Sequence, residues 1–416
     1  MKSFEVLGIQ AARRALDEVR AGLEDGLARD RLDRIEAVLA RVAANLELRR
    51  GFDEKLGARP PAIDAAIAWD NDASRNWEAA IADFDPRQAN AETASDDLAG
   101  RLQVWLAARH ADAEAPRVIS AKRLPGGRSK QTLIVDLEAS GALPPRIVLR
   151  TDSSRTTVHD SVAHEFPLVE AVYRAGCPVP EPLWLETEES VIGAAFIAFA
   201  HVGGSPAGNL WGAFDKSGDA ARELAKALAR VHRVPVTAVP GGTAQPARTA
   251  VDALLSTYEA RWRAALPRPS TIIGNAFAWL RARLDRVEGD AAIVHGDAHF
   301  SNMLMEDGRL TCLLDWEFWH FGHPAEDLAY ARPYVEATLD WQEFLAIYLA
   351  AGGRAVTTAQ LDLFAIWRPL RNAVLASTIA HDFRAHEDLD LETAAIALST
   401  FPRMEAQVAA ALAVAN

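Results

Sequence analysis

Three side chains of the types needed for phosphoryl transfer lie close together in the second half of the chain. Asp297 follows a short apolar stretch, Asn302 comes five residues later, and Asp315 ends the next apolar stretch. Phosphoryl transfer needs an acceptor for the proton of the substrate hydroxyl and hard oxygen ligands for Mg²⁺. The spacing therefore predicts Asp297 as the catalytic base, with Asn302 and Asp315 as ligands of Mg²⁺.

Each of these residues alone has a simpler explanation. An aspartate after a strand usually forms a turn or caps a helix, and an asparagine in a loop is often a turn former. Their combination favours phosphoryl transfer, because all three occur in a strand, loop, strand context that follows a β-rich region.

The surrounding sequence extends this pattern. Residues 293–330 are IVHGDAHFSNMLMEDGRLTCLLDWEFWHFGHPAEDLAY, and YEARWRAAL and AWLRARL precede them at 258–266 and 278–284. At these residues the chain resembles the aminoglycoside phosphotransferase and choline kinase superfamily. More narrowly, it is similar to the phosphotransferase module that is fused to some acyl-CoA dehydrogenases. The resemblance covers about residues 117–400.

The resemblance implies the same roles for Asp297, Asn302 and Asp315 and adds supporting residues around them. Asp327 matches a buried aspartate that holds the catalytic loop through backbone hydrogen bonds. Glu317 either touches a second ion or faces solvent. The supporting residues are His295, His299, Glu317 and Asp327. The family's usual Gly-Asp-Pro is replaced here by a Gly-His-Pro at 322–324, a departure that affects the mouth of the acceptor pocket.

Local patterns predict an α+β fold of the bilobal protein-kinase type, with an antiparallel-sheet N-lobe and a helical C-lobe. Three short β-rich segments, RVISAKRL, QTLIVDLE and RIVLRTD, follow Pro116 and are separated by Gly and Pro turn signals. A helix is expected over residues 160–174 and a further strand over 191–200. Most segments after residue 214 have helical periodicity, apart from the strands AAIVHGD and LTCLLDW.

The apolar pattern in the first part of the chain predicts an all-helical accessory domain. Apolar residues recur at alternating spacings of three and four over 9–27 and again over 32–46. These two stripes form either an antiparallel hairpin or the seam of a homodimer, and both alternatives stay open. The expected domains are the accessory domain at 1–112, the nucleotide-binding N-lobe at 117–202, and the C-lobe with the catalytic loop and acceptor pocket at 203–416.

Several residues of the expected N-lobe are candidates for binding ATP or GTP. A glycine-rich turn between two strands allows the backbone to approach phosphates. Arg150 stands where kinases place the lysine that pairs with a helix glutamate, here Glu165; Lys122 or Lys130 is the alternative phosphate contact. The hinge between the lobes is expected to bind adenine through its backbone. The nucleotide-site candidates are Gly126, Gly127, Ser129, Arg150, Glu165, His201 and Val202.

The acceptor site is expected downstream of Asp315, in the helical lobe. Its candidates are large aromatic residues, which are also common core residues, and two arginines that either receive an anionic group or pair with nearby carboxylates. The candidates are Trp316, Trp319, Tyr330, Trp367, Arg368 and Arg371. Aminoglycosides are polycations and need a strongly acidic pocket. The one dense acidic run near the end, at 386–392, resembles a solvated loop or helix start, which weakens the case for an aminoglycoside acceptor.

These observations favour an ATP-dependent kinase that phosphorylates a hydroxyl group of a neutral or anionic small molecule. Two alternatives remain. One is a kinase that inactivates aminoglycoside or macrolide antibiotics, and the other is a nucleotide-binding pseudokinase or scaffold that acts through the N-terminal helices.

Composition also limits the classes of function and the cellular location that the sequence allows. The 416 residues carry a formal net charge of −13, which argues against sequence-independent binding of nucleic acid. Cys177 and Cys312 are far apart and are expected to be buried apolar residues. The N-terminus lacks the apolar core of a secretory signal, and no apolar run is long enough to span a bilayer. A cytoplasmic protein with no membrane partner is therefore predicted.

Overall fold

The computed structural model describes eight stretches of the chain, and residues 1–97 with the predicted accessory helices lie outside them. The described stretches are 98–109, 116–124, 130–138, 143–152, 161–208, 216–265, 270–385 and 391–415. They fall into two compact units. One contains residues 254–282 and 365–416, and the other contains 84–253 and 283–364.

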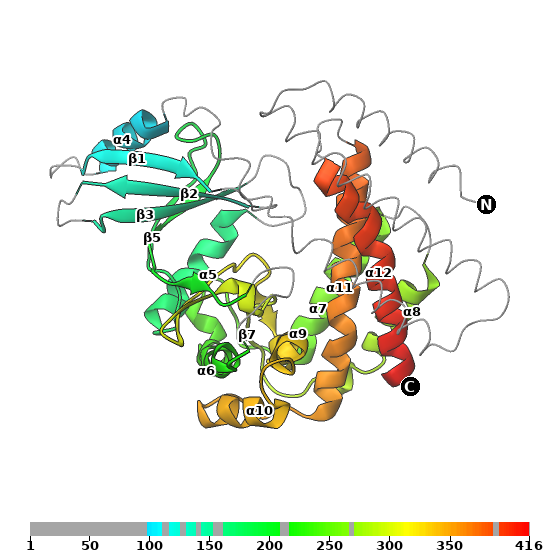
Figure 1. Cartoon of the computed structure of the whole chain (residues 1–416). Coiled ribbons are helices and arrows are strands. Elements are labelled where there is room, and N and C mark those ends of the chain that lie inside the picture. Colours follow the sequence, from blue (N-terminus) through cyan, green and yellow to red (C-terminus); the bar gives the residue numbers. More distant parts are fainter. Residues whose placement is uncertain are drawn as a thin grey trace, which may run out of the picture. The chain divides into compact units, whose positions relative to one another are not determined.

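The larger unit contains a five-stranded antiparallel sheet (Figure 1). Its order is β1-β2-β3-β5-β4, with β1 at Val118–Arg123, β2 at Lys130–Leu137, β3 at Arg146–Asp152, β4 at Pro182–Glu186 and β5 at Phe196–Ala200. The alternation along β2 puts Leu133, Val135 and Leu137 on the buried face, as expected for a half-buried strand. The predicted antiparallel sheet is confirmed, while β4 was not predicted.

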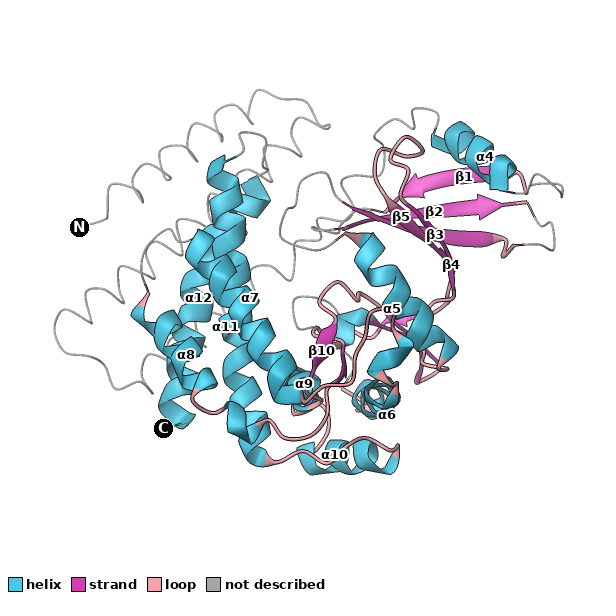
Figure 2. Ribbon diagram, turned by 180° about the vertical axis from the view of Figure 1, so that it is seen from behind, coloured by secondary structure: helices cyan, strands magenta, loops and turns pink. Residues whose placement is uncertain are grey.

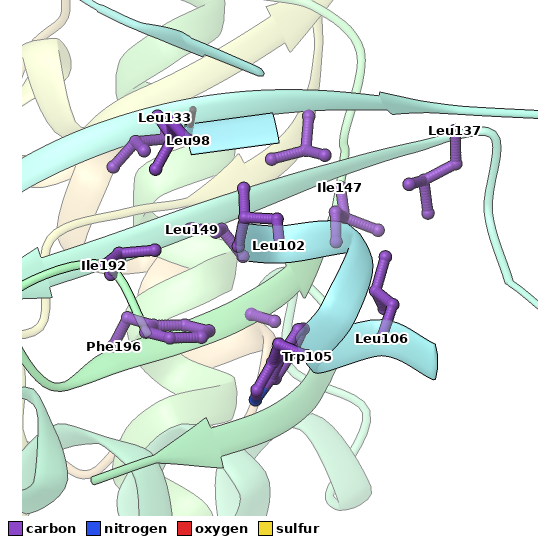
Figure 3. Close-up of a cluster of buried hydrophobic side chains, with 12 residues drawn as sticks. Leu98, Leu102, Trp105, Leu106, Leu133, Leu137, Ile147, Leu149, Ile192 and Phe196 are labelled. Carbon is purple, nitrogen blue, oxygen red and sulfur yellow. The ribbon is translucent and has the colours of Figure 1, made fainter. Parts of the chain in front are cut away.

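Helix α4, at Leu98–Arg109, packs on this sheet (Figure 3). Its apolar face contributes Leu98, Leu102, Trp105 and Leu106 to one buried cluster with side chains of β2 and β3. Burial of these side chains removes apolar surface from water, which stabilises the pairing of helix and sheet. The sequence placed this segment in the accessory domain, but its side chains complete the core of the sheet.

Polar contacts fix the middle and the C-terminal end of α4. Gln103 Oε1 accepts a hydrogen bond from the backbone N–H of Val118, 2.7 Å away, at the start of β1. Trp105 Nε1 and Arg109 Nη2 both donate to Oε2 of Glu186, at 2.7 and 2.6 Å. Burial raises the pKa of Glu186, but these donors and the N–H of Glu188 outweigh it and lower the pKa to about 2.

Helix α5, at Val162–Arg174, follows strand β3 and carries Glu165 into the interior. Ser161 caps it by accepting a hydrogen bond from the N–H of Ala163. Helices α6 and α10 pack on each other farther along the same unit (Figure 1). The remaining elements are β6 (Ser205–Pro206), α6 (Asp219–Arg233), η2 (Val236–Ala238), η3 (Leu284–Arg286), β7 (Ala292–Val294), η4 (Phe300–Asn302), β8 (Met303–Glu306), β9 (Arg309–Leu313), β10 (His320–Gly322), α9 (Ala325–Val335) and α10 (Trp341–Ala350).

The other unit is helical. It draws on α7 (Ala247–Ala265), α8 (Thr271–Arg281), α11 (Thr358–Ala385) and α12 (Leu391–Ala415), of which α7 and α11 begin in the larger unit. Helices α8 and α12 lie side by side (Figure 2). The rings of Tyr258 and Trp367 pack edge to face, with centroids 5.1 Å apart.

Both cysteines are buried and unpaired, as predicted. Burial raises the pKa of Cys177 to about 11 and that of Cys312 to about 12, which disfavours the reactive thiolate. Among the described helices, none combines the length and the apolar composition that crossing a bilayer requires.

Candidate active site

The catalytic loop begins where strand β7 ends. Strand β7 pairs antiparallel with β10, and the chain then passes through His295 and Gly296 to Asp297. The turn η4 brings Asn302 back to Asp297. Asn302 Nδ2 donates to the backbone oxygen of Asp297 at 3.0 Å and to its Oδ2 at 2.9 Å. Asp297 and Asn302 therefore lie side by side at the end of a buried strand.

The backbone of this loop is held by Asp327 of helix α9. Its Oδ2 accepts a hydrogen bond from the N–H of His295, and its Oδ1 accepts one from the N–H of Gly296, both at 2.8 Å. Burial raises the pKa of Asp327, but the hydrogen bond from His232 and the surrounding donors outweigh it and lower the pKa. The contacts have the form that the family resemblance implied for Asp327.

A buried hydrogen-bond chain stands behind Asp327. His232 Nε2 lies 2.9 Å from Oδ2 of Asp327, and His232 Nδ1 lies 2.9 Å from the hydroxyl of Tyr348. Nε2 of His232 donates to the carboxylate, and in a neutral ring Nδ1 would then accept from the Tyr348 hydroxyl. Tyr348 in turn accepts from the N–H of Arg354 at 3.3 Å. Sequence reasoning missed His232 and Tyr348, since nothing in their local sequence connects them to Asp327.

Two backbone conformations shape the loop. Gly296 has φ of 81°, and a Cβ at this position would stand 2.3 Å from the backbone oxygen of Phe318. Glycine is therefore required at position 296. Asp315 has φ of 67°, in the left-handed region that a non-glycine residue seldom adopts. Such strain concentrates at functional positions.

His295 links the two strands that carry the site. Its Nε2 donates to the carbonyl oxygen of Leu314 at 2.9 Å, and its Nδ1 accepts from the N–H of Asp297 at 3.2 Å. Burial lowers the pKa of His295, which keeps the ring neutral and leaves Nδ1 able to accept. The indole of Trp316 packs on this ring and donates to the carbonyl oxygen of Leu313. These contacts make Trp316 a core residue beside the loop.

Arg150 of strand β3 joins the sheet to the segment of Asp315. Its Nε donates to Oε2 of Glu165 at 3.1 Å, and its Nη2 donates to Oδ1 of Asp315 at 2.5 Å. Oε2 of Glu317 is 3.8 Å from the same Nη2. Burial lowers the pKa of Arg150, but the carboxylates of Asp315 and Glu165 outweigh it and raise the pKa. The guanidinium is therefore a permanent cation among three carboxylates.

Lys130 supports the same cluster from strand β2. Its ammonium group lies 2.6 Å from Oδ1 of Asp152 and 3.9 Å from Oε1 of Glu165. Burial raises the pKa of Glu165, and the charge of Arg150 counters this effect. Lys130 is thus part of the ion-pair network around Glu165, while the cation that contacts Asp315 is Arg150.

Two side chains near the loop carry oxygen atoms of the kind that hold Mg²⁺. Because Nδ2 of Asn302 donates to Asp297, the Asn302 oxygen Oδ1 is the atom that can bind a cation. Asp315 adds a carboxylate that is one-third exposed. Within the described stretches, His, Cys, Asp and Glu side chains form no metal-type group of three or more. An ion here would complete its shell with phosphate oxygens and water, as Mg²⁺ commonly does.

The other predicted residues divide into three groups. Gly126, Gly127 and Ser129 lie outside the described residues, as does the 386–390 part of the acidic run. His201 and Val202 follow strand β5, where the hinge was expected. Trp367, Arg368 and Arg371 belong to the helical unit, so their part in an acceptor site stays a prediction.

Two predicted acceptor residues and the Gly-His-Pro segment pack near the loop. The ring of Trp319 stacks on His164 of α5 at 4.7 Å, and Tyr330 is buried 6.2 Å from the ring of His299. His323 is buried against Phe364, and burial lowers its pKa to about 4.

Known proteins share both the sequence pattern and the fold. The model of the phosphotransferase enzyme family matches residues 120–370. Acyl-CoA dehydrogenase family member 11 of the chicken, Gallus gallus, is 25% identical over 237 residues, which are 49% of this chain and 29% of that protein. The chain thus spans less than a third of the length of this relative, and the predicted resemblance to its phosphotransferase module is confirmed.

Solved structures give the same result for the fold. A macrolide 2′-phosphotransferase from Brachybacterium faecium is 21% identical, with a TM-score of 0.51, covering 71% of this chain and 97% of that one. A choline/ethanolamine kinase family protein from Mesorhizobium loti is 17% identical, with a TM-score of 0.51, covering 76% and 99%. The kinase-like α+β fold is therefore confirmed. Because the family model matches more than half of its residues, the chain belongs to the phosphotransferase enzyme family.

Proposed function

We propose that the protein transfers the γ-phosphate of ATP, or of GTP, to a hydroxyl group of a neutral or anionic small molecule. The observation that carries the proposal is the contact of Arg150 with both Glu165 and Asp315. It joins the expected phosphate-binding cation to the expected metal-binding carboxylate. Phosphoryl transfer depends on this kind of positioning and charge stabilisation more than on covalent chemistry.

Each residue of the site has a distinct task in this proposal. Asp297 accepts the proton of the substrate hydroxyl as its oxygen bonds to the γ-phosphorus and the bond to the β,γ-bridging oxygen breaks. Arg150 binds phosphate oxygens. Asn302 and Asp315 would hold Mg²⁺, which neutralises phosphate charge when bound.

The charge balance of the site supports an acceptor that is not a polycation. Glu165, Asp315 and Glu317 all lie within ion-pair distance of Arg150. Asp152 is paired with Lys130. Each of these carboxylates already lies within ion-pair distance of Arg150 or Lys130, whereas a polycationic acceptor needs carboxylates that are available to it.

The first test is calorimetric titration of the chain with ATP, with and without Mg²⁺. Binding that depends on Mg²⁺ is expected, and failure to bind under either condition would contradict the proposal. A library of hydroxyl compounds, including macrolides and aminoglycosides, is then screened for ATP consumption. Turnover of an antibiotic would favour the resistance alternative, and binding without turnover of any compound would favour the pseudokinase.

The second test replaces the proposed base. Asp297→Asn removes the proton acceptor and is expected to lower kcat by about 100- to 10,000-fold. Asp307→Asn is the matched control, because Asp307 lies in the β8–β9 turn with φ of 49°, a conformation that asparagine tolerates. Full activity of Asp297→Asn would show that another group is the base. The cytoplasmic location stays a prediction, as do the domain bounds and a homodimer through the N-terminal helices.

A further inference from the structure

Two side chains at the η4 turn make successive contacts that lead to the proposed base. Oγ of Ser301 lies 2.7 Å from Nδ1 of His299, and Nε2 of His299 lies 3.2 Å from Oδ2 of Asp297. Building on the proposed function, we propose that His299 is a positioning residue that fixes the carboxylate of Asp297, and that Ser301 selects the tautomer of His299 that can do so.

The tautomer follows from the partners of the ring. An ionised carboxylate only accepts hydrogen bonds, so Nε2 of His299 must carry a hydrogen to bind Asp297. A neutral imidazole then has its lone pair on Nδ1, and the hydroxyl of Ser301 must be the donor there. In the opposite tautomer, the lone pair of Nε2 would face the lone pairs of Asp297.

Helix α9 holds the plane of the His299 ring. Tyr330 and Tyr334 pack on the imidazole, with ring centroids 6.2 and 5.6 Å away. Asp327, Tyr330 and Tyr334 are separated by three and four residues, so they share one face of α9. The same helical face thus supports the backbone of the loop through Asp327 and the side chain of His299 through the two tyrosines.

The need for a second donor follows from the dual task of Asn302. Its Nδ2 also donates to Oδ2 of Asp297, but its Oδ1 is the proposed ligand of Mg²⁺. The orientation of this amide would therefore respond to a bound ion as well as to Asp297. His299 is not a proposed ligand and supplies a donor that does not change with the ion. Without that donor, the carboxylate has greater rotational freedom, and a small misplacement of a reacting group slows reaction strongly.

The tautomer itself is measurable without any activity. Histidine-selective ¹⁵N labelling gives ring nitrogen signals for the 11 histidines, and His299 is assigned by the signals lost in His299→Gln. The Nε2–H tautomer is expected in the native chain, and a change in the His299 nitrogen shifts is expected in Ser301→Ala. A native Nδ1–H tautomer, or identical shifts in Ser301→Ala, would overturn the proposal.

Kinetics test the effect on the base, with Mg·ATP as the probe and water or a hydroxyl compound found by screening as the acceptor. His299→Leu removes the donor and is expected to lower kcat by about 100-fold, with KM for ATP nearly unchanged. In His299→Gln, the side-chain amide can donate from a similar distance, and most of the activity should return. Equal losses in the Leu and Gln variants, at equal thermal stability, would contradict a donor role.

A double-mutant cycle separates positioning from general support of the fold. Ser301→Ala is expected to lower kcat by about 3- to 10-fold when His299 is present, the usual effect of one hydrogen bond. It should have no effect in the His299→Leu background, because Ser301 acts through His299. Ser190→Ala removes an exposed hydroxyl that donates to Glu188 and is the matched control. Additive losses in the cycle would refute the coupling.

The two proposals fail in different ways. A native chain that neither binds nor turns over Mg·ATP contradicts the proposed function, and the ¹⁵N spectrum still decides the tautomer of His299. A native chain that turns over ATP while His299→Leu keeps full activity contradicts the positioning role alone.

Discussion

Nη2 of Arg150 donates to Oδ1 of Asp315 across 2.5 Å, although the two residues are 165 positions apart in the sequence. The contact ties a strand of the sheet to the segment that follows the catalytic loop. Asp315 sits there in a left-handed conformation, so its carboxylate is aimed by the backbone and held by the guanidinium.

Replacing Arg150 should weaken nucleotide binding. Arg150→Ala leaves Glu165 and Asp315 without their shared cation, so their charges repel phosphate; calorimetry should show a Kd for Mg·ATP about 10- to 100-fold higher. Arg150→Lys should give an intermediate value, because an ammonium keeps the charge without the planar fork. The control is Arg146→Ala on the same strand, because the Arg146 side chain is half exposed and pairs with Asp136. Native affinity in Arg150→Ala would exclude the phosphate-binding role.

Replacing Asp327 should lower the stability of the protein. Asparagine offers one acceptor where three donors converge, from His295, Gly296 and His232. Asp327→Asn is expected to lower the free energy of unfolding by about 3 kcal/mol, measured by chemical denaturation. Asp340→Asn is the control, because Asp340 caps helix α10 and asparagine caps equally well. Equal stabilities of the two variants would show that the Asp327 network is not needed.

His320 should make the stability depend on pH. Burial lowers the pKa of His320, but the carboxylate of Glu326, 2.9 Å from its Nε2, outweighs it and raises the pKa. A raised folded-state pKa stabilises the protein fully below the unfolded pKa, near 6.5. This stabilisation is lost as the pH rises through the folded value.

The variant His320→Gln isolates this effect. The difference in thermal midpoint between the native chain and the variant should be larger at pH 6 than at pH 9. A difference that is constant with pH, or larger at pH 9, would contradict a charged His320 in the folded protein.

The packing of α4 on the sheet predicts a clear contrast between two positions of one helix. Leu102 is buried and Val104 is 72% exposed. Leu102→Ala should lower the free energy of unfolding by about 2–5 kcal/mol, because it leaves a cavity in the core of the sheet. Val104→Ala should change it by less than about 0.5 kcal/mol. Similar effects of the two substitutions in chemical denaturation would mean that α4 is not part of this core.

Much of the fold could be predicted because its strands alternate or are uniformly apolar. The three segments before residue 153 and the strand ending at Ala200 appear at the expected positions. Strand β4 was missed because PLWLE begins with a proline and has no clear alternation. The docking of α4 was missed because an apolar helical stripe identifies a buried face and not its partner.

Two contacts of the candidate site were predicted because they join residues that are close in sequence or lie on successive elements. Asp297 and Asn302 are five residues apart, and the Arg150–Glu165 pair follows from a strand and the next helix. Longer-range contacts carried no local signal. The hydrogen bond from His232 to Asp327 spans 95 positions, and only the fold brings them together.

Helix α4 has a practical consequence for anyone who trims this polypeptide. The family match begins at residue 120, whereas the side chains that cover one face of the sheet begin at Leu98. A fragment starting at the match would retain Asp297 and Asn302 but leave Leu133, Leu149 and their neighbours facing water. Such a fragment should self-associate, because its exposed apolar side chains would pack against those of other copies. The segment that must be present for folding is therefore longer than the segment that the family match covers.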